Sequence, residues 1–130
     1  MARMIAMALT MLAMAAGAVR AQEPIDISAA ANMGFADEVE GDRQGGWTDQ
    51  GRVNDLRTMP VGRQRYGKIE FEVIDPNANG GRSCLIFAGP EREYFLKQAE
   101  IPVNGQSLKF LYLLHGSAWT PKDASPIGTI

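Results

Sequence analysis

Residues 68–74 read Lys68-Ile69-Glu70-Phe71-Glu72-Val73-Ile74, and this alternation of polar and apolar side chains decides the fold class. A period of two predicts a β-strand with one face in water and the other on a core. The turn-forming stretch Asp75-Pro76-Asn77-Ala78-Asn79-Gly80-Gly81 then ends the strand. We expect residues 83–88 to return across this turn as the antiparallel partner.

Outward from this strand the chain is rich in Gly, Pro, Asn and Asp, and the intervals between these residues are too short for long helices. The sequence therefore predicts an all-β protein, with further strands at residues 25–28, 100–103 and 107–115. Phe110 to Leu114 is apolar on both faces, which is typical of a central strand or a sandwich core. Residues 41–62 are predicted to form one long loop, and loops of that length are usually functional or disordered.

The N-terminus has the three parts of a secretory signal peptide. Arg3 supplies a positive charge, residues 4–16 form an uncharged apolar run, and residues 16–21 offer small side chains to a signal peptidase. We expect a signal-peptide helix over residues 1–21, cleavage after Ala21 or Ala18, and a mature β-sandwich domain over residues 22–130 in the periplasm or outside the cell. The alternatives are an uncleaved membrane anchor and a buried core helix, but the apolar run is shorter than the roughly 20 residues of a bilayer span. No membrane span is expected after cleavage.

Charge and cysteine content limit the possible partners and bonds. Residues 1–21 carry two arginines and no acid, so their removal takes the formal net charge from −2 to −4. This acidity argues against nucleic acid as a partner, because phosphate binding depends on clustered Lys and Arg. Cys84 is the single cysteine, so no intrachain disulfide can form, and we expect it to be a buried thiol that packs as a small hydrophobe.

A series of motifs resembles a galactose-binding-like β-sandwich domain. They are Gly45-Gly46-Trp47-Thr48-Asp49-Gln50-Gly51, Asn54-Asp55-Leu56-Arg57, Pro60, Gly62, Phe71, Ile74-Asp75-Pro76, Gly80 and Leu111-Tyr112-Leu113-Leu114-His115. Such domains are accessory modules of exported bacterial glycoside hydrolases, and the resemblance spans residues 25–128. It implies a jelly-roll fold. In the family a further strand and an Asp-Gly turn follow the motif that ends in His, whereas this sequence ends Ile127-Gly128-Thr129-Ile130. The resemblance therefore implies an incomplete sandwich, whose open sheet edge another chain could close.

The long loop carries the residue types of a sugar site, in which an aromatic face stacks on a pyranose and polar groups bind its hydroxyls. Trp47 is the expected platform, and the expected contacts are Asp49, Gln50, Asn54, Asp55, Arg57, His115 and Trp119. The same residues also fit a purely structural role. In that alternative Trp47 plugs one end of the sandwich, while Asp49, Asn54 and Asp55 satisfy backbone donors of the loop.

The loop is also rich in acids, which leaves a structural calcium ion open as the only cofactor. Asp37, Asp42 and Asp49 are the candidate ligands, although their spacing matches no EF-hand. The alternative is that these acids form a solvated surface without an ion. No catalytic motif of the Gly-x-Ser-x-Gly, His-Glu-x-x-His or phosphate-loop type is present.

We therefore expect an exported, non-catalytic module that binds a polysaccharide or other glycan through the loop around Trp47. The alternatives are a structural or interaction domain, and a fragment of a multidomain glycoside hydrolase with no activity of its own. A small hydrolase that uses two carboxylates has the least support.

Overall fold

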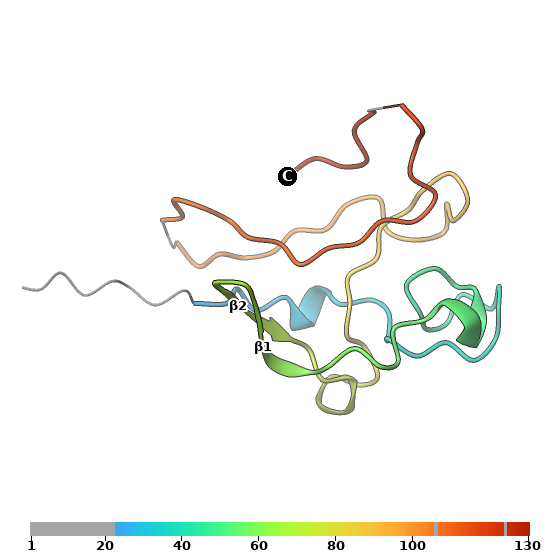
Figure 1. Ribbon diagram of the computed structural model, residues 1–130. Helices are drawn as coiled ribbons and strands as arrows, with labels where there is room; N and C mark the ends of the chain where they lie inside the picture. Colours follow the sequence, from blue (N-terminus) through green and yellow to red (C-terminus); the bar gives the residue numbers. More distant parts are fainter. Residues whose placement is uncertain (1–22, 106, 124) are drawn as a thin grey trace, which may run out of the picture.

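The computed structural model describes residues 23–105, 107–123 and 125–130, so the predicted signal peptide lies outside the described residues. The elements in chain order are the 3₁₀ turns η1 (Ser28–Ala30) and η2 (Gly51–Asn54), the strands β1 (Gly62–Tyr66) and β2 (Ile69–Val73), and the 3₁₀ turn η3 (Pro76–Ala78). Figure 1 shows that long irregular segments connect them. None of the described helices has the length and apolarity to cross a bilayer. The described part of the chain confirms the prediction of a β protein without long helices. The β content is low, however, because the described residues form one two-stranded sheet and are otherwise largely irregular.

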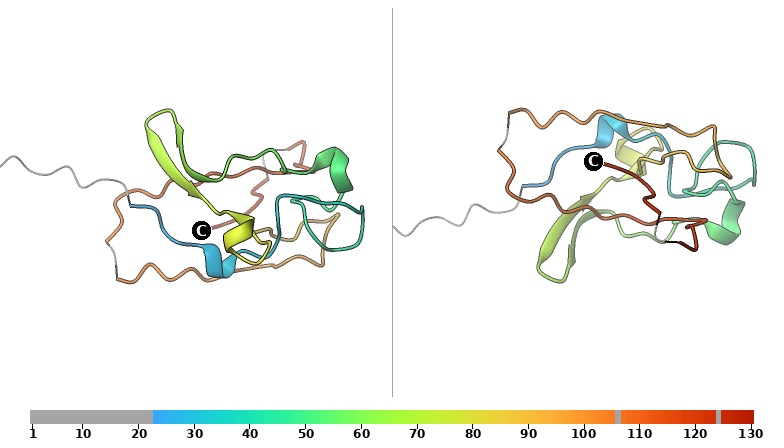
Figure 2. Two further views of the ribbon diagram at one scale, coloured as in Figure 1. Left: turned by 90° about the horizontal axis from the view of Figure 1, so that it is seen from below. Right: turned by 90° about the horizontal axis from the view of Figure 1, so that it is seen from above.

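The sheet is an antiparallel hairpin in which Gly62 pairs with Val73 and Tyr66 with Ile69. The alternation predicted for β2 is confirmed, because Ile69, Phe71 and Val73 are at least partly buried while the glutamates between them are exposed. Tyr66 and Phe71 pack across the pair with their ring centroids 6.0 Å apart. Both views in Figure 2 show this hairpin projecting from the rest of the chain.

The predicted partner of β2 was wrong. Residues 83–88 do not pair with β2. The two-residue connection Gly67-Lys68 instead places the preceding strand, β1, beside β2. The stretch after β2 forms η3, where Asp75 accepts a hydrogen bond from the backbone N–H of Asn77. Residues 83–88 make two isolated bridges, from Cys84 to Met33 and from Phe87 to Leu96.

The strands predicted at residues 25–28, 100–103 and 107–115 are not formed in the described part of the chain. The core prediction for residues 110–114 was also wrong, since all five side chains are exposed, from Leu111 at 46% to Phe110 at 69%. A run that is apolar on both faces needs a neighbour on each, and the described residues do not provide them.

The observed apolar core is small: its buried members are Ala31, Phe35, Val73 and Phe95. The three largest fully buried side chains are polar instead, namely Thr48, Asp37 and Asp49. Burial of such groups costs free energy unless each is hydrogen-bonded, so the loop that carries them must supply partners. That loop is the centre of the candidate site.

Candidate functional site

The segment from Ala36 to Arg57, here called the Asp loop, folds around two glycines. Gly45 and Gly46 both have positive φ, and the N–H of Gly46 donates to the carbonyl of Ala36 at 3.0 Å. A Cβ at Gly45 would lie 2.3 Å from that carbonyl oxygen, and one at Gly46 would lie 2.7 Å from the Asp37 carboxylate. The glycine pair therefore lets the loop close tightly over Asp37.

Asp37 and Asp49 are the buried acceptors inside the Asp loop. The Asp37 carboxylate accepts from the N–H groups of Val39 and Gly51. One oxygen of Asp49 accepts from the N–H groups of Gly41 and Arg43, and the other accepts from the hydroxyl of Tyr94. For Asp49 this is the structural role that the sequence left open: it satisfies loop backbone donors.

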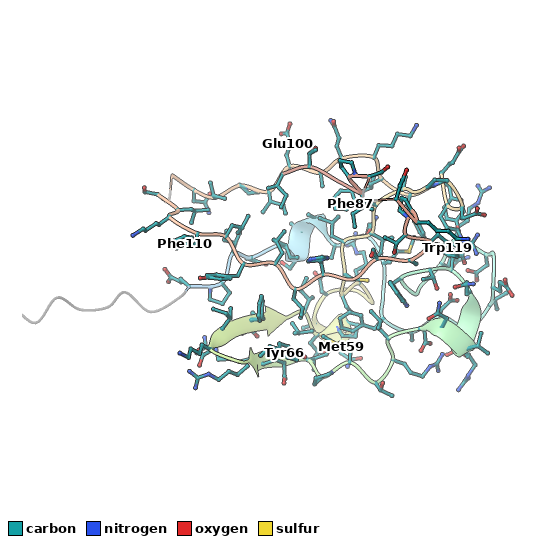
Figure 3. All side chains as sticks on the ribbon, turned by 45° about the horizontal axis from the view of Figure 1, so that its top comes forward. Met59, Tyr66, Phe87, Glu100, Phe110 and Trp119 are labelled. Atoms are coloured by element: carbon teal, nitrogen blue, oxygen red, sulfur yellow. The ribbon has the colours of Figure 1, made fainter. Side chains whose placement is uncertain are left out.

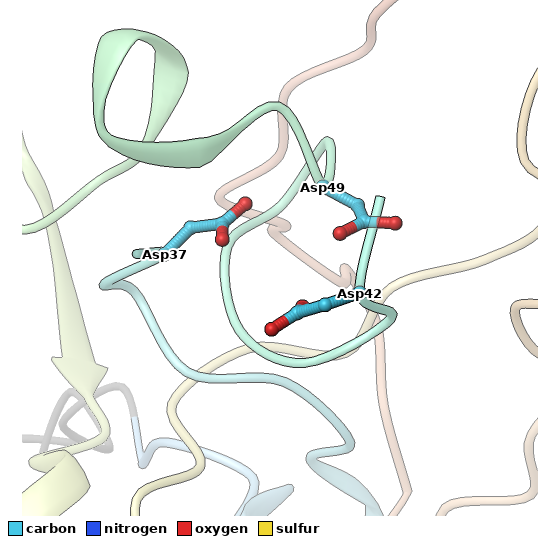
Figure 4. A group of neighbouring side chains, drawn as sticks. All are labelled: Asp37, Asp42 and Asp49. Carbon is cyan, nitrogen blue, oxygen red and sulfur yellow. The ribbon is translucent and has the colours of Figure 1, made fainter. Parts of the chain in front are cut away.

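Asp42 brings a third carboxylate to the same place. One oxygen from each of Asp37, Asp42 and Asp49 lies within 4.8 Å of the others, and Figure 4 shows the three side chains converging. Asp42 is exposed, whereas the other two are buried. Among the ion pairs of the described residues none involves these three carboxylates. Their oxygens are the hard ligands that calcium takes, so the donor set fits a divalent cation.

Asp55 and Arg57 close the far end of the loop. Asp55 accepts from the N–H groups of Asp37 and Arg57 and from the Arg57 guanidinium, which also donates to the Asp37 carbonyl. The hydrogen bond from Arg57 is the main reason that the pKa of Asp55 falls to about 2. The Asp55 side chain is only 3% exposed. Asp55 therefore also satisfies loop donors, and Arg57 is occupied in holding it.

Gln50, Asn54 and Thr48 form a smaller polar group around η2. Asn54 donates from its side chain to that of Gln50 at 2.6 Å, and the Thr48 hydroxyl donates to the Asn54 carbonyl at 3.0 Å. The Asn54 side chain thus bonds to another side chain, not to the loop backbone as the structural alternative required. Gln50 and Asn54 are half-buried.

Trp47 is half-buried, and its indole N–H is buried with no hydrogen-bond partner among the described residues. Gly116 lies against its ring, since a Cβ on that glycine would be 3.6 Å from the indole. The neighbouring His115 is exposed and makes no hydrogen bond with the described residues. Trp47 is therefore packed against the C-terminal segment and offers less free ring surface than the sequence suggested.

Trp119 joins the Asp loop through Arg92, a residue that sequence reasoning missed. The Arg92 guanidinium lies 4.9 Å from the centre of the Trp119 ring, and its Nε donates to the carbonyl of Thr48 at 2.9 Å. The indole remains 45% exposed. Figure 3 shows the labelled Trp119 at the end of the molecule away from Phe110.

A second stacked pair, also missed, lies beside the first. The Arg43 guanidinium lies 4.9 Å from the centre of the Tyr94 ring, and Tyr94 is 39% exposed. Burial and the hydrogen bond to Asp49 raise the pKa of the Tyr94 hydroxyl to about 12, although Arg92 and Arg43 act in the opposite direction. The only sequence signal was the mixture of charged and aromatic residues in Glu91-Arg92-Glu93-Tyr94. We call Arg43, Arg92, Tyr94 and Trp119 the Arg–aromatic surface.

A hollow in the described part of the chain lies away from these residues. A cavity of about 460 Å³ separates residues 23–30 from residues 100–104, and no predicted site residue lines it. Cys84 is not a catalytic candidate either, because burial raises the pKa of its thiol to about 12 and the thiolate is the reactive form. Comparisons of the chain with protein-family models, with curated proteins and with solved structures give no match.

Proposed function

We propose that this chain is an exported, non-catalytic carbohydrate-binding module with a galactose-binding-like jelly-roll fold. The ordered motifs of the sequence and the β character of the described chain support the proposal. The observation that carries it is Trp119, an exposed indole held against the Asp loop by Arg92. Sugar sites commonly use such a ring, because the C–H face of a pyranose stacks on it.

The exposure of the two indoles supports Trp119 over Trp47 as the proposed platform. Trp47 packs against Gly116, whereas Trp119 keeps nearly half its surface free although Arg92 covers one face. Asp49 and Asp55 are buried and hydrogen-bonded within the loop, so they would position the site without contacting the sugar. Arg92, whose guanidinium lies 4.9 Å from the centre of the Trp119 ring, is the polar group that would reach sugar hydroxyls beside this platform.

Glycan binding tests this proposal directly. We expect saturable binding to at least one polysaccharide on a broad glycan array, and Trp119→Ala should weaken it about tenfold through the lost stacking contact. Tyr66→Ala is the matched control, because Tyr66 is a comparably exposed aromatic residue on the projecting hairpin. An array without a hit, or equal losses for the two variants, would contradict the proposal.

A structural calcium ion is part of the proposal, held by Asp37, Asp42 and Asp49. Its support is electrostatic: two nearly fully buried carboxylates lie beside a third, and a cation would offset their mutual repulsion. Such an ion would neutralise the charges of the three carboxylates and would tie the exposed Asp42 to the buried Asp37 and Asp49.

Calcium should therefore raise the midpoint of thermal unfolding by several degrees at saturation, because it binds the folded chain only. Asp42→Asn should remove most of that increase, and it leaves the buried carboxylates intact since Asp42 is exposed. Glu40→Gln is the control, an exposed acid of the same loop outside the cluster. If melting with calcium and with a chelator coincides in the unaltered protein, there is no calcium site.

The second candidate function is a structural or interaction domain without a glycan. It is favoured by the hydrogen bonds of Asp49 and Asp55, because both carboxylates accept from backbone N–H groups of the loop itself. The glycan array separates the two candidates, because only the first requires a ligand.

A further inference from the structure

The two arginines of the Arg–aromatic surface carry positive charges that no carboxylate of the described chain offsets by direct contact. The ion pairs of the described residues include neither Arg43 nor Arg92. The neighbouring acids Glu91 and Glu93 are exposed and pair with neither guanidinium. Because arginine stays charged at any physiological pH, this surface presents two permanent cations to a ligand.

Both guanidinium groups also keep hydrogen-bond donors for an external acceptor. Arg92 donates to backbone carbonyls, those of Thr48, Glu91 and Asp49. A guanidinium has more N–H groups than these bonds use, so part of its fork stays free. The Arg43 guanidinium donates to no atom of the residues that the structure describes. A complementary ligand therefore has to bring acceptors.

Asp49 holds both arginines near the Tyr94 hydroxyl. Its carboxylate accepts from that hydroxyl and from the backbone N–H of Arg43, the latter at 3.2 Å. Its carbonyl accepts from the Arg92 guanidinium at 3.4 Å. Both guanidinium charges favour the ionised form of Tyr94, although burial and the bond to Asp49 outweigh them and raise its pKa to about 12. Asp49 is fully buried, so this junction is anchored in the interior of the Asp loop.

Each of the two cations also lies against a partly exposed aromatic ring, Arg92 against Trp119 and Arg43 against Tyr94. Such a ring can stack on the C–H face of a pyranose, while the guanidinium beside it binds an acidic substituent of the same glycan. We propose that the Arg–aromatic surface selects acidic glycans, in which the pyranose units carry carboxylate or sulfate groups. Acidic selectivity of this kind rests on the proposed glycan-binding function and specifies its ligand class.

Contacts at the arginines, not long-range attraction, would give this selectivity. The formal net charge of the chain is −2, so the molecule as a whole does not attract polyanions. A planar guanidinium matches two oxygens of an acidic group with two parallel hydrogen bonds, which fixes orientation as well as charge. Nucleic acid fits less well, because its binding depends on larger clusters of Lys and Arg.

The test compares polygalacturonate with the same polysaccharide after chemical reduction of its carboxyl groups, by isothermal titration calorimetry on the purified full chain. We expect the acidic form to bind about tenfold more tightly, because only it accepts charge-assisted hydrogen bonds from the arginines. A sulfated galactan and its desulfated form repeat the comparison for sulfate, and a preference for either acidic form supports the proposal. Inorganic polyphosphate, which carries charge without a sugar ring, should bind more weakly than the acidic glycan.

Arg43→Gln separates recognition from folding, since its guanidinium makes no hydrogen bond with the described residues. It should weaken binding of the acidic glycan about tenfold and leave binding of the reduced form unchanged. Arg92→Gln should also reduce the acidic preference, and circular dichroism checks its fold because Arg92 bonds to the Asp loop. Arg65→Gln is the control, an exposed arginine of β1 without an ion pair among the described residues.

The outcomes separate this selectivity from glycan binding itself. Equal affinity for the acidic and the reduced polysaccharide would overturn the acidic selectivity and leave the glycan-binding proposal in place. The absence of binding to any glycan would overturn both. Polyphosphate binding as tight as that of the acidic glycan, or equal losses for Arg43→Gln and Arg65→Gln, would show that charge alone is recognised, and would overturn the selectivity.

Discussion

At the scale of single residues, buried carboxylates replace the backbone pairing that a strand would have supplied. Asp37, Asp49 and Asp55 together accept hydrogen bonds from six backbone N–H groups of the described chain. A long loop has to satisfy its backbone N–H groups with side-chain acceptors. The acid-rich sequence alone therefore predicts a structural role for these carboxylates. Arg92 and Tyr94 could not be found that way, because their contacts join segments more than 40 residues apart.

Asp55→Asn should lower the free energy of unfolding by about 1–3 kcal/mol at neutral pH, because the N–H of Asp37 and the Arg57 guanidinium lose a charged acceptor. The pKa of Asp55 is lowered to about 2, chiefly by Arg57. A carboxyl with a lowered pKa stabilises the fold above its unfolded value near 4, and this stabilisation is lost as the pH falls towards about 2.

Urea unfolding of the unaltered chain and of Asp55→Asn at several pH values measures this difference. It should be constant from about pH 5 to 7 and shrink below about pH 4. Glu93→Gln, an exposed acid without side-chain hydrogen bonds in the described part, should change little at any pH. A difference that grows as the pH falls would have the wrong sign.

At the scale of elements, the hairpin shows what local pattern can and cannot predict. The alternation in β2 was sufficient to identify the strand, since it depends only on which face meets the core. The predicted partner was wrong because the turn-rich stretch after Val73 and the connection before Ile69 both carry turn signals, and the hairpin forms at Gly67, which has the positive φ of a tight two-residue connection. Glycine at the first central position is the requirement of a type II′ turn, so this signal was present in the sequence.

Gly67→Ala should therefore destabilise the hairpin by about 1 kcal/mol, because φ at this position is +64° and an L residue is strained there. Gly89→Ala is a matched control. A Cβ added at Gly67 or at Gly89 would meet no atom within 4 Å, but of these two glycines Gly67 alone has a positive φ. Amide hydrogen exchange in β1 and β2 reports the effect. Equal protection in both variants would show that the turn conformation carries no cost.

At the scale of the whole molecule, the described chain buries few apolar side chains and leaves many exposed. The sequence predicted that residues 110–114 would lie in a sandwich core, because a run that is apolar on both faces is typical of a strand covered on both sides. Whether such a strand is covered depends on neighbours that the pattern does not specify. The exposed run therefore shows that an apolar pattern does not identify the neighbours that would cover it.

The burial of Cys84 makes the reactivity of its thiol depend on local opening of this weakly packed molecule. Its sulfur lies 3.4 Å from the carbonyl oxygen of Met33, beside the bridge that ties residues 33 and 84. Burial raises the pKa of this thiol to about 12, so very little of it is the reactive thiolate at neutral pH in the closed chain. Opening of the bridge would restore an ordinary thiol, whose lower pKa leaves more of it ionised. In an oxidising compartment, oxidised Cys84 would therefore accumulate on chains that have opened. Chains that have stayed closed would keep the reduced thiol.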